Sequence, residues 1–353
     1  MKNLLMITRK VDKDEAQAGF AYSWVKKFAQ RVGRLKVICL EKGNLDGLPL
    51  NVELFSLGKE KGKNRLKEFI NFQRGALKFI GKVEAVFCHM NPEYTILISP
   101  YVKLFNKKII SWYSHRAVNW RVRLMTLLTH RVATPTEESF GLKSKKKVIV
   151  GHGIDTDLFK PAGSDPHEGR TLKIISVGRI SPIKNYETLI EAIDILDKRN
   201  LPLKAQIIGG LGLPSHQSYF DKLKQIIKKK GLESVVEFKG LIPNQKLPEY
   251  YQGSDLSVNL CPTGSPDKAV LEAMACGCPT IVCNKTFSND FGPYREKLLF
   301  KEKDPDDLAQ KIDNLIKSNQ LEAIGKFLRE RVFKHHNLDN LIEKLLYVFE
   351  KIS

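Results

Sequence analysis

Residues 254–282 read SDLSVNLCPTGSPDKAVLEAMACGCPTIV, and this stretch decides the fold class of the chain. The apolar run at residues 256–260 predicts a buried strand, and the Pro and Gly residues of 261–266 predict a loop. A short helix over about 267–275 and a second strand at 280–283 follow. A strand, a loop and a helix N-terminus in succession offer free backbone N–H groups to an anion. An ordinary βαβ unit has the same pattern, so both interpretations stay open at this point.

The alternation of apolar runs and helical patterns extends over the whole chain. In the first half it predicts strands at 4–8, 36–40, 52–55, 85–88, 108–112, 131–133 and 147–150, with helices at 21–32 and 63–80. In the second half it predicts strands at 172–177, 204–208, 235–239, 256–260 and 280–283, with helices at 185–198, 217–230 and 246–252. Strands that alternate with helices form a parallel sheet covered on both faces. We therefore expect an α/β protein with two doubly wound, Rossmann-like domains, whose ligands bind beyond the carboxyl ends of the strands.

The boundary between these domains is predicted in residues 160–170, KPAGSDPHEGR, where Pro, Gly, Ser and charged residues replace the apolar periodicity. A chain of 353 residues is also long enough for two domains. The predicted domains are residues 1–162 and 163–335. A C-terminal helix at 336–353 completes the chain.

The net charge of +19 is concentrated in the first half of the chain. Residues 1–150 hold 29 Lys and Arg against 12 Asp and Glu, a net charge of +17, whereas residues 151–353 hold 29 against 27, a net charge of +2. Such a basic half is suited to an acidic partner, namely an anionic lipid, a phosphorylated substrate or a nucleic acid, although a solvated basic surface is also consistent with it.

No membrane-spanning run and no secretory signal is expected, because no segment of about 18 apolar residues occurs and the N-terminus begins with a strand pattern. The six cysteines lack the paired spacing of a zinc site, so we expect reduced thiols in a cytoplasmic protein.

Several residues at predicted strand ends of the first half are candidates for substrate contact. Gly19 closes the loop after the first strand, where a glycine lets the backbone approach a ligand closely. This loop has no GxGxxG fingerprint, which disfavours a nicotinamide site. His89 and His115 each follow a strand and are candidates for a catalytic role, although a lone histidine is more often structural. The stretch 117–131 mixes basic, aromatic and apolar residues, which suits either an anionic membrane interface or a helix packed on the sheet.

In the second half, the sequence GRISPIKN places two cations in one strand-end loop that begins at Gly178. Arg179 can bind two phosphate oxygens with its planar guanidinium, and Lys184 adds a mobile point charge. Together they form a clamp for a diphosphate. Gly209, after the next strand, allows another close approach of backbone to ligand.

GRISPIKN, IIGGLG, VEFKGLIPNQKLPEYYQGSDLSV and AVLEAMACGCPTIV, in this order and spacing, resemble the donor half of glycosyltransferase family 4, the glycosyl transferases group 1. In the first half, HMNPEY, WYSHRA and GHGIDTDLF also fit, so the resemblance covers essentially the whole chain. It implies the GT-B fold, in which two Rossmann-like domains face each other across a cleft, and in which a C-terminal helix often returns to the first domain.

The resemblance also implies retaining transfer of a sugar from a nucleotide diphosphate donor without a metal ion. It implies that Arg179 and Lys184 bind the donor diphosphate and that the Glu272 carboxylate binds the ribose hydroxyls. His115 matches a histidine near the reacting sugar. The remaining matches concern the donor's phosphates and base, and they are Gly19, the backbone of Gly240, Leu241 and Ile242, and the helix start at Lys268, Ala269, Val270 and Leu271.

One departure from the family pattern concerns the sugar. Members of this family carry a second Glu eight residues before the ribose-binding one, and here that position is Gly264. The carboxylate that contacts the sugar is therefore missing, or Asp267 of the same loop replaces it.

The expected function is that of a glycosyltransferase acting on a glycan, a lipid-linked acceptor or another anionic acceptor, in the cytoplasm or at the inner membrane face. Its donor would be a UDP-, GDP- or other nucleotide sugar, with no further cofactor. A nucleotide-sugar epimerase or hydrolase of the same fold is an alternative. A non-catalytic protein that binds nucleotide sugar or nucleic acid is another, but binding to nucleic acid alone would not need clustered donor residues in the neutral half.

Overall fold

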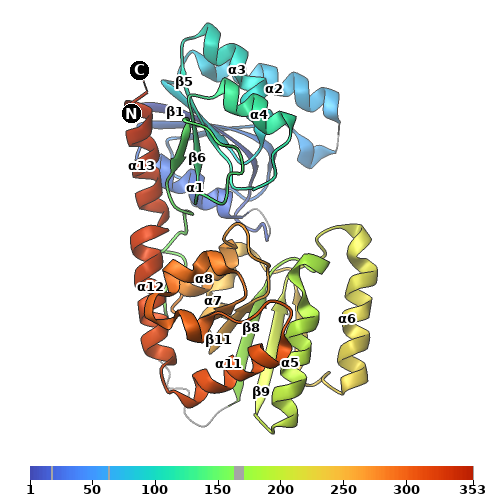
Figure 1. Cartoon of the computed structure of the whole chain (residues 1–353). Helices are drawn as coiled ribbons and strands as arrows, with labels where there is room; N and C mark the ends of the chain where they lie inside the picture. The colour runs from blue at the N-terminus through green and yellow to red at the C-terminus, as the bar shows by residue number, and fades with distance from the viewer. Residues whose placement is uncertain (17–18, 63, 163–170, 353) are drawn as a thin grey trace. The chain divides into compact units, whose positions relative to one another are not determined.

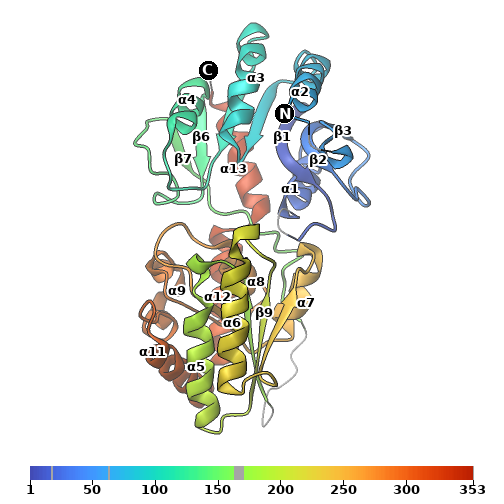
Figure 2. The same cartoon turned by 90° about the vertical axis from the view of Figure 1, so that its right-hand side faces the viewer.

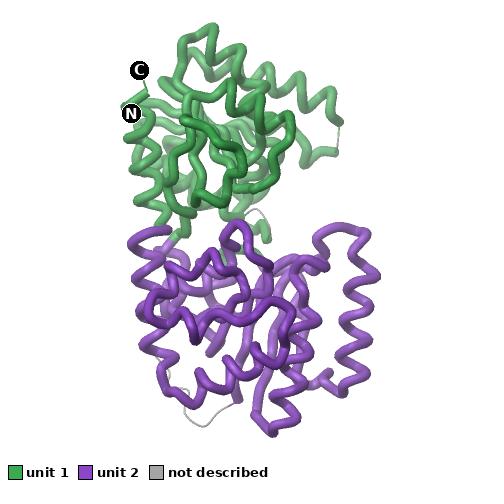
Figure 3. Tube along the Cα trace, in the orientation of Figure 1, with its two compact units in different colours: residues 1–155, 243–245, 337–353 green, residues 156–242, 246–336 purple. Residues whose placement is uncertain are grey.

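The computed structural model of the chain describes residues 1–16, 19–62, 64–162 and 171–352. The contacts between residues divide the chain into two compact units. Unit 1 comprises Met1–Asp155, Pro243–Gln245 and Asn337–Ser353, and unit 2 comprises Thr156–Ile242 and Lys246–His336 (Figure 3). Most of the linker predicted at residues 160–170 lies outside the described residues, so the predicted domain ranges stay a prediction.

Unit 1 is built on a seven-stranded sheet in the order β3-β2-β1-β4-β5-β6-β7 (Figure 1). All neighbouring strands are parallel, with Met6 of β1 opposite Val37 of β2 on one side and Phe87 of β4 on the other. Strands covered on both faces are largely apolar, and the sequence predicted each of the seven from its apolar run. They are β1 (Asn3–Val11), β2 (Arg34–Lys42), β3 (Val52–Ser56), β4 (Ala85–His89), β5 (Lys108–Trp112), β6 (Arg131–Thr134) and β7 (Lys147–Ile149).

Two of the connecting helices of unit 1, α2 and α4, begin at side-chain caps. The Asn64 side chain accepts a hydrogen bond from the Lys67 N–H at 3.0 Å, and the Asn119 side chain accepts one from the Val122 N–H at 3.1 Å. The helices are α1 (Phe20–Ala29), α2 (Arg65–Ile80), α3 (Pro92–Leu104) and α4 (Trp120–Leu128), with a 3₁₀ turn η1 (Lys59–Lys61). Helix α3 was not predicted, because it contains Pro100 and its apolar residues follow no clear helical period.

Helix α4 lies in the stretch 117–131, which the sequence suited either to a membrane interface or to a helix packed on the sheet. Val122, Met125 and Thr126 are buried, so one face packs against the unit. Trp120 and Leu127 stay exposed on the remainder of the helix. The helix occupies nine residues of the stretch 117–131.

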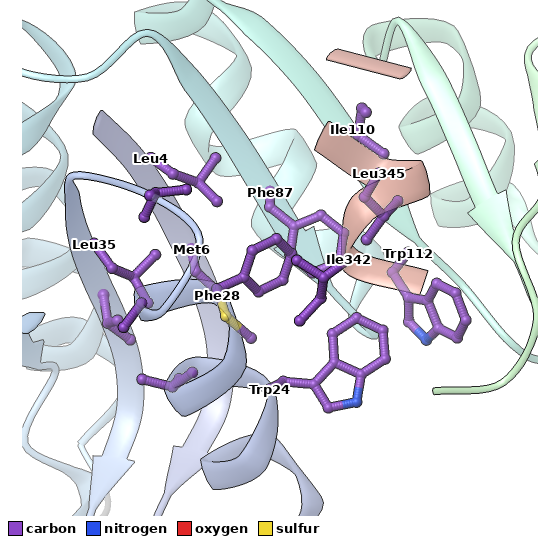
Figure 4. Close-up of a cluster of buried hydrophobic side chains, with 14 of the residues drawn as sticks. Leu4, Met6, Trp24, Phe28, Leu35, Phe87, Ile110, Trp112, Ile342 and Leu345 are labelled. Atoms are coloured by element: carbon purple, nitrogen blue, oxygen red, sulfur yellow. The ribbon is translucent and has the colours of Figure 1, made fainter. Parts of the chain in front are cut away.

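The last helix of the chain, α13 (Leu338–Glu350), belongs to the core of unit 1 (Figure 4). Ile342 and Leu345 lie in one cluster with Trp24 and Phe28 of α1 and with Phe87 of β4. Ion pairs border this contact, since the buried Lys27 ammonium lies 2.9 Å and the partly exposed Arg31 guanidinium 2.8 Å from the Asp339 carboxylate. The opposite face of the sheet packs on α2 and α3 through a second cluster that includes Phe72, Phe79 and Ile98.

Unit 2 repeats the design with a five-stranded parallel sheet in the order β10-β9-β8-β11-β12. Its strands are β8 (Leu172–Val177), β9 (Leu203–Ile208), β10 (Val236–Gly240), β11 (Leu256–Asn259) and β12 (Thr280–Val282). In this order the chain returns across the sheet between β10 and β11, so β8 and β11 are neighbours. A crevice for ligands in an open α/β sheet forms at such a switch point, outside the carboxyl ends of the strands.

The helices of unit 2 form two sets. Helix α5 packs on α6 and α11, and Figure 2 shows α5 and α6 running side by side, whereas α8 packs on α7 and α12. The helices are α5 (Tyr186–Lys198), α6 (Gln217–Lys230), α7 (Leu247–Gln252), α8 (Lys268–Ala275), α9 (Ser288–Phe291), α10 (Arg295–Leu298), α11 (Pro305–Lys317) and α12 (Leu321–His335). Short 3₁₀ turns are η2 (Pro182–Lys184), η3 (Pro214–His216), η4 (Asn244–Lys246), η5 (Lys285–Phe287) and η6 (Gly292–Tyr294). None of the helices in the described residues is long and apolar enough to cross a membrane.

Candidate functional site

The loop that follows β8 is held against its neighbours by backbone hydrogen bonds. The Gly178 carbonyl accepts a hydrogen bond from the hydroxyl of the buried Tyr186 at 2.9 Å. The Ile180 N–H donates to the Gly210 carbonyl at 2.7 Å. A side chain at Gly178 would lie 3.0 Å from the Lys184 Cε, so the absence of one leaves room for the lysine beside the strand end.

The end of β9 lies so close to this loop that only glycine fits there. Gly209 has φ +151°, and a Cβ atom on it would lie 1.9 Å from the Gly178 carbonyl oxygen. Its N–H donates to the Gly240 carbonyl at 2.9 Å. Three strand ends are thereby joined, and Gly178, Gly209 and Gly240 lie together at the carboxyl edge of the sheet.

The chain leaves β10 through Gly240, which has φ +70°. Leu241 is exposed, and its side chain covers Gly210, where a Cβ atom would lie 2.8 Å from the Leu241 Cγ. Ile242 is half-buried. These residues bring an apolar surface to the same edge of the sheet as Gly178 and Gly209.

Helix α8 begins at this edge with Asp267 as its N-cap. The Asp267 carboxylate pairs with the Lys184 ammonium from the β8 loop. It also accepts hydrogen bonds from the Asn259 side-chain amide at 3.0 Å, the Cys261 thiol at 3.3 Å and the Ala269 N–H at 3.3 Å. One carboxylate therefore collects donors from the β8 loop, the end of β11 and the first turn of α8.

The ion pair between Lys184 and Asp267 is electrostatically strong because the two side chains are only 12% and 18% exposed. Burial opposes the ionised carboxylate, but Lys184 outweighs this effect and holds the pKa of Asp267 far below its ordinary value. Burial likewise opposes the ammonium, and the Asp267 charge reverses the effect, so the pKa of Lys184 is raised. Both groups are therefore charged at neutral pH.

Glu272 lies one turn into α8, with its side chain almost entirely buried. The Lys268 ammonium is 3.3 Å from its Oε1, as expected of residues four apart on a helix. Val270 and Leu271 point into the core, whereas Lys268 and Ala269 are partly exposed. A carboxylate held beside the first turn of α8 can accept hydrogen bonds from a pair of neighbouring hydroxyl groups.

Arg179 differs from Lys184, although both were predicted as one clamp. Its side chain is exposed, and it forms no salt bridge with another described residue. The structure therefore brings Lys184, Glu272 and the glycines to one edge of the sheet and leaves the Arg179 guanidinium in solvent.

Gly264 occupies an open position in the loop between β11 and α8. A Cβ atom there would meet only the Pro262 carbonyl oxygen, at 3.9 Å. The Gly264 carbonyl accepts a hydrogen bond from the Thr286 hydroxyl at 2.6 Å. The position therefore has room for the Cβ atom of a larger residue.

The candidates of unit 1 lie in contrasting surroundings. His89 is buried, shares a hydrogen bond of 3.0 Å with the Thr8 hydroxyl, and its ring centroid is 4.6 Å from that of Trp24. His115 is exposed, with its ring 5.6 Å from that of Tyr113. Gly19 precedes α1, and a Cβ atom on it would lie 2.3 Å from the Glu15 carbonyl oxygen.

Sequence reasoning missed the network around Asp267. It named this residue only as a substitute for a missing sugar contact, whereas the structure engages the carboxylate with Lys184. The network is completed by Asn259 and Cys261, which have no signal beyond their places at the end of a strand and in the loop after it. Within the parts of the chain that the structure describes, no three His, Cys, Asp or Glu side chains are grouped so as to hold a metal ion.

Comparison with known proteins shows that part of the chain is similar to a family. Residues 163–331 match the family model described as Glycosyl transferases group 1. Mannosylfructose-phosphate synthase from Agrobacterium fabrum is 28% identical over 156 residues, which cover 41% of this chain and 34% of that protein. A component of the phosphatidylinositol N-acetylglucosaminyltransferase from Arabidopsis thaliana is 27% identical over 176 residues, which cover 50% of this chain and 38% of that protein. The matches thus span between a third and a half of the length of these relatives.

Solved structures resemble the chain over nearly its whole length. The structure of HepE from Anabaena in complex with UDP and glucose matches with a TM-score of 0.78 and 16% identity, covering 99% of this chain and 100% of that chain. Sucrose-phosphate synthase from Thermosynechococcus elongatus matches with a TM-score of 0.76 and 15% identity, covering 99% of each chain. At this identity the likeness concerns the fold, and it confirms the GT-B fold predicted from the sequence.

Proposed function

We propose that this protein is a glycosyltransferase that uses a nucleotide sugar, because residues 163–331 match the family model described as Glycosyl transferases group 1. The observation that carries the proposal is the convergence of Lys184, the start of α8 and Glu272 at the carboxyl edge of one parallel sheet. This edge lies at the switch point of the strand order, where open α/β sheets bind their ligands.

The proposed donor is a nucleoside diphosphate sugar, and each part of it has a group to meet. Lys184 and the N–H groups of the first turn of α8 would bind the diphosphate, and Arg179 has the freedom to close on it from solvent. The Glu272 carboxylate would accept hydrogen bonds from the ribose hydroxyls. The nucleotide base would lie against Gly240, Leu241 and Ile242.

Breaking the anomeric C–O bond leaves negative charge on the departing diphosphate, so cations and N–H dipoles that are already in place lower the barrier. We propose that Arg179, Lys184 and the start of α8 supply this stabilisation in a retaining, metal-independent transfer. His115, being exposed, is the better candidate to contact the reacting sugar or move a proton. The burial of His89 among aromatic rings favours a supporting role for it.

The proposed acceptor is a glycan, a lipid-linked molecule or another anionic acceptor reached at a membrane face. Helix α2 supports this proposal because it is apolar on two sides. The inner side of the helix is buried through Phe72, Ala76, Phe79 and Ile80. A second set of apolar side chains at helical spacing, the outer stripe, is exposed, and it comprises Leu66 (70% exposed), Phe69 (48%), Ile70 (42%) and Leu77 (60%). Basic residues of the same helix accompany the stripe: Arg65, Lys67, Arg74 and Lys78.

An apolar stripe bordered by cations is the pattern of a helix that lies on an anionic bilayer. The outer stripe of α2 is therefore the proposed membrane contact of the basic unit 1. The name of the Arabidopsis relative, which includes phosphatidylinositol, is consistent with a lipid acceptor.

Turnover of isotope-labelled UDP-, GDP-, ADP- and dTDP-sugars in the presence of membrane lipids tests the function. We expect Arg179→Ala to lower donor turnover by about 100-fold or more, since one donor of charge stabilisation contributes about that factor. Glu272→Gln should also lower donor turnover, because it weakens the hydrogen bonds to the ribose hydroxyls. Lys173→Ala, an exposed cation at the opposite end of β8, is the matched control and should keep full activity. Full turnover in the Arg179 and Glu272 variants would contradict the site, and conversion of the donor without any acceptor would favour an epimerase or hydrolase.

A further inference from the structure

Asp267 occupies the position that the proposed function gives to a phosphate. Its carboxylate contacts the Lys184 ammonium and the Ala269 N–H, and both of these groups belong to the proposed diphosphate site. The Asn259 amide and the Cys261 thiol donate to the same carboxylate oxygen as Lys184. A convergence of one cation with N–H and S–H donors at a helix start is what an anionic oxygen requires.

We propose that Asp267 is an internal competitor of the donor, whose carboxylate holds the phosphate position until a diphosphate displaces it. The inference rests on the proposed function, because it assigns to Asp267 the control of that same site. Asp267 is thereby a determinant of which anions bind, and not a contact for the transferred sugar.

The competition follows from charge at close range. A diphosphate within contact distance of Lys184 would also lie within a few ångström of the Asp267 carboxylate, where like charges repel strongly because water is largely excluded. The carboxylate must therefore leave before the diphosphate can be seated. The measured affinity therefore equals the intrinsic affinity multiplied by the fraction of molecules in which the carboxylate has already left.

This competition selects among ligands. An anion held by Lys184 alone gains no more than the carboxylate it replaces. A nucleoside diphosphate brings additional charge and a second point of attachment at Glu272, so it can displace Asp267 where inorganic phosphate cannot.

A second polar group in the same loop also points to an exchange of partners. The Ser181 side chain is 5% exposed, and its hydroxyl has no hydrogen-bond partner among the described residues. The Ser181 carbonyl accepts a hydrogen bond from the Lys184 N–H at 2.9 Å, so the hydroxyl and the lysine belong to one tight turn. A buried hydroxyl without a partner is costly, and a bound phosphate oxygen would satisfy it.

The variant Asp267→Asn tests the inference because asparagine also caps helix N-termini but carries no charge. We expect it to bind the preferred nucleoside diphosphate of the set UDP, GDP, ADP and dTDP about tenfold or more tightly than the unmodified protein, as measured by calorimetry. Affinity for the corresponding nucleoside, which has no phosphate, should not change. Thermal unfolding of the same samples reports whether the variant is folded.

Asp304→Asn is the matched control, since Asp304 caps α11 in the same unit and also pairs with a lysine, Lys301, at 3.4 Å. It should leave nucleotide affinity unchanged. Weaker or equal diphosphate binding by Asp267→Asn would overturn the inference, while the proposed donor site would still stand if Glu272→Gln abolished binding. Absence of diphosphate binding in both the unmodified protein and Asp267→Asn would overturn the inference and the proposed function together.

Discussion

Gly209 holds the carboxyl ends of two neighbouring strands together because no side chain fits at its position. A methyl group there would lie 1.9 Å from the Gly178 carbonyl oxygen, and the φ of +151° is strained for every other residue. A substitution must therefore push the end of β9 away from the Gly178 loop, which carries Lys184.

We predict that Gly209→Ala lowers the free energy of unfolding by more than about 3 kcal/mol and weakens nucleotide binding, because backbone strain and a steric clash add. Chemical denaturation checks the first effect and calorimetry the second. Gly264→Ala is the comparison for stability, since its Cβ atom would meet nothing closer than 3.9 Å. It should change the free energy of unfolding by less than about 0.5 kcal/mol. Equal stability of the two variants would contradict the assignment of strain to Gly209.

At the scale of elements, α13 completes the core of a unit whose other elements come from the start of the chain. Its residues Leu341, Ile342 and Leu345 are buried against α1 and the sheet, although more than 300 residues of sequence separate them from Trp24. The helix begins where the Asn337 side chain accepts a hydrogen bond from the Asp339 N–H at 2.7 Å.

We predict that Ile342→Ala lowers the free energy of unfolding of unit 1 by about 2–5 kcal/mol, because it leaves a cavity beside Phe87 and Trp24. Tyr347→Ala on the same helix, where the side chain is 58% exposed, should lower it by less than about 1 kcal/mol. Denaturation monitored by tryptophan fluorescence reports on this cluster. If the two variants were equally stable, α13 would not be part of the folded core in solution.

At the scale of the whole molecule, the charge is concentrated in residues 1–150, while the proposed donor site lies in the nearly neutral remainder. The basic surface and the outer stripe of α2 belong to the same unit. Under the proposed function, attraction to a membrane and binding of the donor are therefore properties of separate parts of the chain.

We predict that the protein binds vesicles of phosphatidylglycerol mixed with phosphatidylcholine and that binding falls steeply between about 0.05 and 0.5 M NaCl, because salt screens surface charges. Leu66→Ser combined with Leu77→Ser should weaken binding by more than about tenfold, since two apolar contacts are lost. Leu50→Ser, an exposed leucine of the same unit outside the stripe, is the control. Equal binding to vesicles of phosphatidylcholine alone would contradict an electrostatic contact.

The sequence by itself determined the strands of both sheets, because a strand covered on both faces is largely apolar and such runs were visible, for example at residues 4–8, 36–40, 172–177 and 256–260. It also indicated Lys184, since a charged residue in a strand-end loop is a local feature, whereas Glu272 was indicated only by the resemblance to glycosyltransferase family 4. It did not indicate α3 or the amphipathic α11, although Asp304 and Pro305 are a typical helix start.

Only the tertiary structure decided how these residues are paired. Asp267 and Lys184 are 83 residues apart and meet because β8 and β11 are neighbours in the sheet, an order that no local pattern encodes. For the same reason the sequence could not tell that His89 would be buried among aromatic rings while His115 stayed exposed. Hydrophobic period and residue type are local properties, whereas an ion pair depends on which strand ends the folded chain brings together.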